Sequence, residues 1–376
     1  MSYMIVSRDF WPNAAAIGNG LFKLAKDLAC YGETSVVTMS HSKEEIKQQS
    51  GRCNFLIAKP LTHSGSKIVL RVFEIGYFVL WLIFALVRKK PSNVYVATNP
   101  PILIPFVVAI YAFLFNKSFT YHIQDIHPEA STLIFKLPRS LVVLLKKIDT
   151  WSLNQAETVI TLTEEMKSTL VDRGCIRPIF LLENPSDQSN FSNVEKISGV
   201  IYAGTAGRLQ NMDIVIPAIE QYLSDGGGLS FAFIGGGVYA SELTRLANTY
   251  SKIEYFGKVD GLTALSISAK YAWGLLPING EVLRYAYPSK IPSYLSAGCR
   301  LICCTDLNSS LVKWINKNDL GVCASQDQTS LIDAFRHVES ISRGDVRFSG
   351  FFISTSDFSS TLSSIIRASN DSKSRF

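Results

Sequence analysis

The sequence predicts an α/β protein made of two doubly wound, parallel-sheet domains. Two observations predict it. Strands alternate with helices in two successive blocks, and a polar segment rich in Asn, Ser and Pro, residues 182–198, separates the blocks. A length of 376 residues suits two domains of about 150 residues or more. We expect domains at 1–190 and 195–355, followed by a C-terminal helix or tail at 356–376 that could pack back on the first domain.

The first block reads as short apolar strands, each followed by a loop or an amphipathic stretch. Residues 19–31 predict a helix, because Leu21, Leu24 and Leu28 share one face. Thr163 followed by two glutamates predicts a helix N-terminus over Thr163–Arg173. The strands expected here are Tyr3–Val6, Thr34–Met39, Val94–Thr98, Phe119–Ile123 and Thr158–Leu162.

The second block repeats this alternation, with helical stretches between its strands. The strands expected here are Gly199–Tyr202, Leu229–Ile234, Ile253–Phe256, Trp273–Leu276 and Arg300–Cys304. In parallel sheets of this kind, ligands bind beyond the carboxyl ends of the strands. The residues just after each strand are therefore the candidate site residues.

Composition excludes several classes of protein. Hydrophobic residues make up 47% and charged residues 18%, which excludes a disordered chain. Seven cysteines without CxxC spacing are typical of reduced, buried thiols in the cytoplasm, and five histidines form no ligand-like cluster that predicts a zinc site. Aromatic residues are not interleaved with cations on polar segments, so no nucleic acid partner is expected.

The positive charge is concentrated where the chain is most apolar. Residues 60–150 hold ten Lys or Arg and four acids, against a net charge of +6 for the whole chain. They also hold the uncharged runs 75–87 and 102–115, which are shorter than the roughly 20 residues of a spanning helix. Burial in a core and contact with an anionic membrane surface both remain open for these runs.

Two glycine turns follow strands of the second block. Gly204 and Gly207, with Arg208 beside them, come after the first strand, and Gly235 and Gly236 come after the second. Glycine allows close approach of a phosphate, and a helix start supplies free N–H groups. A plain tight turn is the alternative interpretation of each.

The segment 281–298 follows a buried strand and begins a helix near Pro288. The N–H groups of Ser289 and Lys290, together with the Lys290 ammonium, would hold a diphosphate, and Arg284 could pair with the same anion. A surface helix start with solvated cations is the alternative.

The candidate residues of the first block lie in two loops. Asp125 and His122 stand at the end of a strand, where a carboxylate and an imidazole suit hydroxyl binding or proton transfer. A capping Asp and a His that faces the core are the alternatives. Asn13 and Gly18 lie in a small, glycine-bearing segment before the first helix and are the candidate acceptor contacts with His122.

Taken together and in order, these segments resemble the retaining glycosyltransferases of family 4, which have the GT-B fold with two Rossmann-like domains facing across a cleft. The resemblance runs through almost the whole chain and rests on DFWPN, VYVATNPP, YHIQDIHPEA, TLTEEMK, VIYAGTAGRLQ, FAFIGGG and YPSKIPSYLSAG. The NPP, DxxPE, TLTEEMK and PSK elements look most like the branch that builds bacterial O-antigen and capsule repeats.

The resemblance implies an enzyme that needs no metal or cofactor. It would transfer a hexosyl- or N-acetylhexosaminyl-type sugar, with retention, from a nucleotide-sugar donor in the second domain to a lipid-linked acceptor of the undecaprenyl-diphosphate type. The protein would then lie in the cytoplasm, peripheral to the inner face of the plasma membrane. Asp125, Arg208 and Lys290 are the expected catalytic residues.

This sequence departs from the family's pattern at the donor. Many members carry two glutamates eight residues apart where this chain has Tyr285 and Ser293, and the second usually contacts the nucleotide ribose. Ser293 is therefore the expected, altered donor contact. Thr205 and Gln210 stand where many members carry Arg and Lys. A nucleotide-sugar epimerase and an inactive scaffold subunit of a polysaccharide-assembly complex are the alternative functions.

Overall fold

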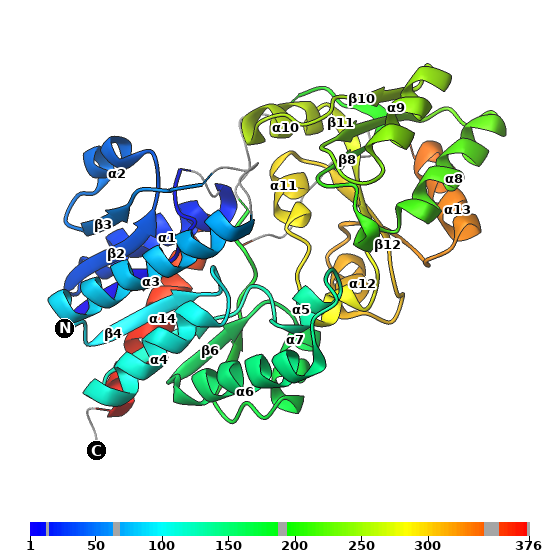
Figure 1. Ribbon diagram of the computed structural model, residues 1–376. Helices are drawn as coiled ribbons and strands as arrows, with labels where there is room; N and C mark the ends of the chain where they lie inside the picture. The colour runs from blue at the N-terminus through cyan, green and yellow to red at the C-terminus, as the bar shows by residue number, and fades with distance from the viewer. Residues whose placement is uncertain (13–14, 63–67, 187–193, 342–352, 374–376) are drawn as a thin grey trace. The chain divides into compact units, whose positions relative to one another are not determined.

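The computed structural model describes residues 1–12, 15–62, 68–186, 194–341 and 353–373. It divides the chain into two compact units (Figure 1). Unit 1 comprises Met1–Pro185 and Ile353–Phe376, and unit 2 comprises Ser186–Phe352. The C-terminal helix is thus part of the first unit, although the whole second unit separates the two in sequence.

Unit 1 contains a seven-stranded parallel sheet in the order β3-β2-β1-β4-β5-β6-β7. Its strands are β1 Ser2–Val6, β2 Glu33–Met39, β3 Asn54–Ala58, β4 Asn93–Ala97, β5 Ser118–His122, β6 Thr158–Thr161 and β7 Ile179–Leu181. Its helices are α1 Ala15–Leu28, α2 Lys43–Gln49, α3 Ile68–Lys89, α4 Leu103–Phe115, α5 Glu129–Thr132, α6 Arg139–Gln155, α7 Glu164–Asp172 and α14 Thr355–Lys373.

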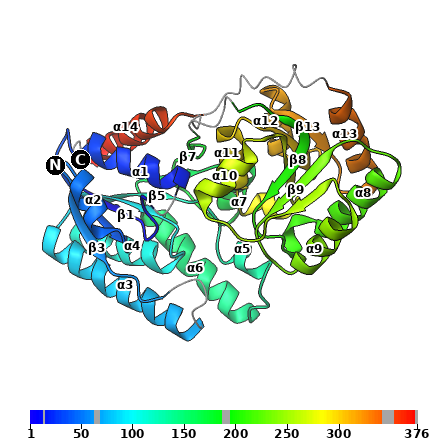
Figure 2. The same ribbon diagram turned by 90° about the horizontal axis from the view of Figure 1, so that it is seen from above.

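The two faces of this sheet carry different helices. Helices α1 and α14 pack together on one face, whereas α3, α4 and α6 lie side by side on the other (Figure 2). Phe358, Leu362 and Ile366 of α14 are buried in one core with Leu21 and Leu24 of α1. The C-terminal helix therefore covers part of the first sheet and completes its core.

Unit 2 contains a six-stranded parallel sheet in the order β10-β9-β8-β11-β12-β13. Its strands are β8 Ile197–Ala203, β9 Ser230–Ile234, β10 Ile253–Tyr255, β11 Tyr271–Pro277, β12 Arg300–Cys304 and β13 Gly321–Ala324. Its helices are η1 Arg208–Gln210, α8 Met212–Ser224, α9 Ala240–Thr249, α10 Gly261–Ser268, η2 Val282–Arg284, α11 Lys290–Ser296, α12 Ser310–Lys317 and α13 Gln328–Ser340.

Both sheets are doubly wound, since strand order reverses direction next to the first strand of each unit, at β1–β4 and β8–β11. The predicted fold class is therefore confirmed. Each predicted strand corresponds to an observed one. The structure adds β3, β7 and β13, which are three to five residues long and were not predicted. The first helix begins at Ala15, four residues before the predicted start, because a run of small residues can be helical without a hydrophobic stripe.

Candidate functional site

The turns that follow β8 and β9 pack directly on each other at the carboxyl edge of the second sheet. Ala206 and Gly237 form a parallel bridge. Gly235 has a φ of +120°, and a Cβ added there would lie 2.1 Å from the carbonyl oxygen of Gly204. Only glycine fits this contact, so the glycines allow the backbones of the two turns to touch.

Most amides of these turns are already used inside the protein. The N–H of Gly204 donates to Ile234 O at 2.8 Å, that of Gly235 donates to Gly257 O at 2.7 Å, and that of Gly207 donates to Gln210 Oε1 at 3.1 Å. The expected cradle of free N–H groups is therefore not formed by these three amides, because each has an internal acceptor. A donor contact through the glycines themselves stays a prediction.

The side chain of Lys290, the first residue of α11, packs against the turn that follows β8. A Cβ added at Gly204 would meet Lys290 Cε at 2.4 Å, so the lysine stem crosses the glycine itself. The Lys290 ammonium donates to Tyr202 Oη at 2.9 Å and lies 4.4 Å from the centre of the Tyr202 ring. Tyr202 Oη in turn donates to Thr205 O at 2.6 Å. Strand β8, its turn and α11 together fix this one ammonium at the sheet edge.

Burial lowers the pKa of Lys290 to about 8, and no carboxylate among the described residues raises it again. None of the ion pairs among the described residues involves Lys290. A buried ammonium whose partners, within the described part of the chain, are one phenol oxygen and one ring face is costly to keep charged. An anion bound beside it would supply the missing counter-charge.

The other predicted donor residues are more dispersed along this edge. Arg284 is exposed on η2 with its guanidinium 5.7 Å from the ring centre of Tyr285. Ser289 and Ser293 are exposed at the start and middle of α11. Arg208 begins η1, directly after Gly207, and its side chain lies outside the described residues. Gly236 lies against another lysine, since a Cβ there would be 2.8 Å from Lys258 Cε.

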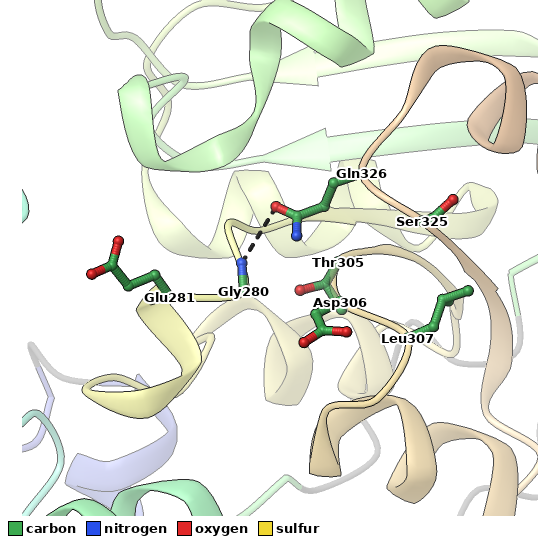
Figure 3. Close-up of a pocket in the computed structure, with 7 residues that line it drawn as sticks. All are labelled: Gly280, Glu281, Thr305, Asp306, Leu307, Ser325 and Gln326. Carbon is green, nitrogen blue, oxygen red and sulfur yellow. Dashed lines mark hydrogen bonds between the residues drawn. The ribbon is translucent and has the colours of Figure 1, made fainter.

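A hollow of about 420 Å³ opens at the carboxyl ends of β11, β12 and β13 (Figure 3). Its lining residues are Gly280, Glu281, Thr305, Asp306, Leu307, Ser325 and Gln326. Gln326 Oε1 accepts from Asn211 Nδ2 at 3.1 Å and from the Gly280 amide at 3.4 Å. The Asn279 amide donates to Leu209 O at 3.2 Å, so the hollow's wall is tied to η1 and the glycine turn.

The polar residues of this hollow are not among the site residues predicted from the sequence. Glu281 and Asp306 supply carboxylates, and the buried Thr305 Oγ1 has no hydrogen-bond partner among the described residues. The signal was available, because each follows a buried strand by one to four residues. Strand β13 was not predicted, so Ser325 and Gln326, which follow it and line one wall of the hollow, were not predicted either.

In unit 1, His122 belongs to the core. It is fully buried, which lowers its pKa to about 3. Its Nδ1 lies 2.6 Å from Tyr95 Oη and its Nε2 lies 2.8 Å from Gln124 Nε2. Because the Gln124 amide is a donor, Nε2 accepts and Nδ1–H donates to the tyrosine. The alternative of a core-facing histidine is the one that the structure shows, and neither ring nitrogen is free for an acceptor sugar.

This histidine positions a polar pair at the carboxyl edge of the first sheet. Gln124 Oε1 accepts a hydrogen bond from Asn184 Nδ2 at 2.9 Å, and the backbone N–H of Gln124 donates to Thr98 Oγ1 at 3.0 Å. Asn184 Oδ1 is buried and has no partner among the described residues. Gln124 and Asn184, which the sequence analysis missed, are thus better placed than His122 to contact a hydroxyl.

Asp125 lies on the loop that follows β5. It has no hydrogen bond or ion pair to another described residue, and burial raises its pKa to about 6. An ion cluster holds this loop: Arg173 donates to His127 O at 3.0 Å and pairs with Glu129 at 3.2 Å and Asp149 at 2.5 Å. A buried carboxylate on a fixed loop fits the expected proton transfer or hydroxyl contact.

The remaining predicted residues are less informative. Gly18 is buried within the first turns of α1, and Asn13 lies outside the described residues. Across the parts of the chain that the structure describes, no three His, Cys, Asp or Glu side chains are grouped so that they could hold a metal ion.

Comparison with known proteins gives structural matches only. No family model matches the sequence, and no curated protein matches it. The chain is similar over 100% of its length to all of Anabaena Alr3699/HepE in complex with UDP-glucose, with a TM-score of 0.62 and 11% identity. It is similar over 98% of both chains to sucrose-phosphate synthase from Thermosynechococcus elongatus, with a TM-score of 0.66 and 12% identity.

A third structure has the same architecture. It is a putative UDP-N-acetylglucosamine 2-epimerase from Listeria monocytogenes, with a TM-score of 0.64, 11% identity and coverage of 99% of this chain and 97% of that one. These matches span both parallel-sheet units. This chain has the GT-B fold. At such low identity the likeness shows the GT-B fold alone, so the reaction has to be argued from this chain's residues.

Proposed function

We propose that this GT-B protein is a glycosyltransferase that takes a sugar from a nucleotide-sugar donor. Unit 2 would bind the donor and unit 1 the acceptor. The observation that carries the proposal is the ammonium of Lys290, which is buried, has no carboxylate partner among the described residues and packs against the turn at Gly204. It stands at the carboxyl edge of a Rossmann-like sheet, where nucleotides bind.

The chemistry requires a cation at this place. When the bond between the sugar's anomeric carbon and the diphosphate breaks, the leaving diphosphate keeps the electron pair and gains negative charge. A fixed ammonium in a poorly solvated setting stabilises that charge more strongly than water does. Lys290 would serve this role, and Arg208 and Arg284 are the further candidates for the same anion.

The acceptor side is proposed on the residues of unit 1. The carboxylate of Asp125 would accept the proton or a hydrogen bond of the attacking hydroxyl, because a pKa of about 6 leaves it ionised but basic at neutral pH. Gln124 and Asn184 would hold other hydroxyls of the acceptor. HepE has been solved with UDP and with UDP-glucose, which supports a uridine nucleotide as the first donor to try.

The finer assignment follows from the resemblance noted in the sequence. We propose retention of anomeric configuration, transfer of a hexosyl or N-acetylhexosaminyl unit without a metal, and a lipid-linked acceptor of the undecaprenyl-diphosphate type. The product would belong to O-antigen, capsule or exopolysaccharide synthesis at the inner face of the plasma membrane. Concentration of cations in the apolar stretch 60–150 supports a membrane-bound acceptor.

Calorimetry tests the donor site without knowledge of the acceptor. The full chain is titrated with UDP, UDP-glucose, UDP-N-acetylglucosamine and GDP-mannose. We expect one donor to bind and Lys290→Met to weaken it about tenfold to a hundredfold. Lys252→Met is the matched control, because Lys252 lies at the amino end of β10 and donates to Gly227 O at 2.7 Å. Equal affinity in wild type and Lys290→Met would refute the assignment.

An epimerase is the second candidate, and a specific observation favours it. The hollow beyond β11–β13 carries two carboxylates, Glu281 and Asp306, and a putative epimerase shares the fold. Incubation of the protein with the bound donor alone separates the two functions. An isomerised sugar without any acceptor indicates the epimerase, whereas an unchanged sugar that is transferred only when a lipid-linked acceptor is added indicates the transferase. A scaffold would bind no donor.

A further inference from the structure

Helix α3 presents a continuous apolar stripe to the outside. The exposed positions recur at three- and four-residue intervals, which places them on one face of the helix. Leu80 is 69% exposed and Phe73 is 68% exposed. The exposed apolar residues of the stripe are Val69, Val72, Phe73, Leu80, Ile83, Phe84 and Val87.

The opposite side of α3 is part of the core of unit 1. Phe78, Leu82 and Leu86 are buried, and so is Glu74. The Glu74 carboxylate accepts hydrogen bonds from the backbone N–H groups of Leu61 and Thr62, at 2.7 Å each. By length and composition the segment Val69–Lys89 could cross a membrane, yet 28% of its most apolar stretch is buried inside the protein. If α3 crossed a bilayer, Phe78, Leu82 and Glu74 would lose these contacts, whereas docking by the exposed stripe keeps them.

Helices α4 and α6 extend the same surface. They follow α3 across one face of the sheet (Figure 2), with α3 against α4 and α4 against α6. Phe113 and Leu114 of α4 are 65% and 66% exposed. Phe113 and Phe106 contact Trp151 of α6 with ring centres 6.3 Å and 5.5 Å apart. The exposed apolar residues of α3 and α4 are called the α3–α4 face below.

The surface charges that residues 60–150 contribute around the α3–α4 face are positive. Of the four acids in residues 60–150, Glu74, Glu129 and Asp149 are buried, and Asp125 is mostly buried at the site described above. The exposed cations of this segment include Arg88 and Lys90 at the end of α3, and Lys136, Arg139 and Lys147 at and before α6. Glu33, an exposed acid from outside this segment, pairs with Lys89 at 3.1 Å, while Arg88 and Lys90 beside it have no such ion pair among the described residues. The segment itself therefore faces outward as an apolar surface with an excess of cations.

We propose that the α3–α4 face docks on an anionic lipid bilayer, with α3 and α4 lying in the plane of the interface. An apolar stripe bordered by cations binds an anionic bilayer in two ways. The stripe is buried among the acyl chains, and the cations are attracted to the lipid phosphates. A second copy of this chain fits less well, because two such faces would both carry an excess of cations, and the exposed Glu33 is already paired with Lys89 of its own chain.

This inference specifies the membrane partner of the proposed function and rests on that function only for the identity of the acceptor. Docking needs no sugar donor, so the two can fail separately. It would place unit 1 at the surface where a lipid-linked acceptor presents its sugar.

Vesicle flotation with the full chain tests the docking. Wild type is compared on phosphatidylcholine vesicles with and without phosphatidylglycerol, using the double variant Leu80→Ser with Phe84→Ser. Its control is Ile176→Ser with Leu262→Ser, which removes two apolar side chains that are 80% and 75% exposed elsewhere. We expect the partition coefficient to fall about tenfold or more in the first variant and to stay at the wild-type value in the control.

Three results would overturn the proposal. One is equal binding to neutral and anionic vesicles, together with no effect of Arg88→Gln with Lys90→Gln, where we expect about a tenfold loss. Another is a wild type that floats with neither vesicle and elutes as a dimer that the Leu80→Ser, Phe84→Ser variant makes monomeric. The third is protein that resists alkaline extraction from cell membranes, which indicates a spanning helix. Donor calorimetry on the same variants should match wild type, because α3 lies outside the proposed donor site. If neither wild type nor the variants bind any donor while the vesicle results hold, the donor site is refuted and the docking proposal stands.

Discussion

Gly204 and Lys290 are packed so closely that a single added carbon at Gly204 would lie 2.4 Å from the lysine Cε. Gly204 also has a φ of +142°, which side-chain-bearing residues rarely adopt. The glycine therefore sets both the path of the turn after β8 and the place of the ammonium. The predictions below start from this contact.

Gly204→Ala should displace Lys290 as well as strain the turn. We expect a loss of about 2 to 3 kcal/mol in the free energy of unfolding and about a tenfold loss of donor affinity. Urea unfolding and calorimetry measure the two effects. Gly226→Ala is the control, because Gly226 has a φ of +90° but open space around it. It should cost about 1 kcal/mol and leave donor binding unchanged.

Lys290→Met should leave the protein as stable as wild type or more stable. The methionine fills a similar volume and removes an ammonium whose burial is unfavourable, as its pKa of about 8 indicates. Urea unfolding at neutral pH measures this. A variant that loses donor affinity without losing stability marks Lys290 as a binding group, whereas a loss of more than about 2 kcal/mol would make its role structural.

Donor affinity should fall as the pH rises through about 8. Below that pH Lys290 carries its proton and offsets the diphosphate, and above it the free protein presents a neutral amine. Donor titrations between about pH 7 and about pH 9 bracket this pKa. They should show a donor affinity that weakens as the pH rises, together with proton uptake on binding. In Lys290→Met the same titrations should show no such trend, and a trend that persists there would assign it to another group.

Transfer should depend on a group that ionises near pH 6. Because burial raises the pKa of Asp125 to about 6, its carboxylate forms as the pH rises through that value, and kcat/KM should rise with it. Asp125→Asn should lower kcat by about a hundredfold to a thousandfold with donor affinity unchanged. The acid limb of the profile should vanish in the residual activity of this variant. A variant with wild-type kcat would remove Asp125 from the mechanism.

Unit 1 should lose stability in acid through His122. Its folded pKa of about 3 lies below the ordinary value, so the unfolded chain takes up the proton first. The contribution of His122 is complete above about pH 6.5 and is lost at about 1.4 kcal/mol per pH unit below it. Urea unfolding between neutral pH and about pH 5 measures the slope. His122→Gln should reduce that slope, and an unchanged slope would assign the acid sensitivity to other groups.

The candidate site was predictable where chemistry follows a strand in sequence. Lys290, Asp125 and the two glycine turns were all identified from their positions after apolar strands, and each stands at a carboxyl edge of a sheet. The hydrogen-bond partners of these groups could not be predicted in this way. That Gly207 donates to Gln210, or that His122 faces Tyr95 and Gln124, depends on which side of a strand faces the core.

The hollow beyond β11, β12 and β13 shows the same limit. Glu281, Asp306 and Gln326 come from three segments up to 45 residues apart, and only the sheet order brings them to one wall. Strand β13 is short and contains Gly321, whose position against Leu301 O leaves no room for a Cβ. Its apolar pattern alone did not predict a strand.

The amino-acid order by itself determined the two blocks, their parallel sheets and the edges where ligands bind, because hydrophobic periodicity and turn residues act over a few neighbours. Tertiary structure alone decided which amides have acceptors inside the protein, and that Lys290 has no carboxylate partner in the described part of the chain. It also decided that one face of α3 is exposed while the other is in the core. Those outcomes depend on what distant segments place beside each group, and burial and counter-charge are properties of that surrounding rather than of the residue.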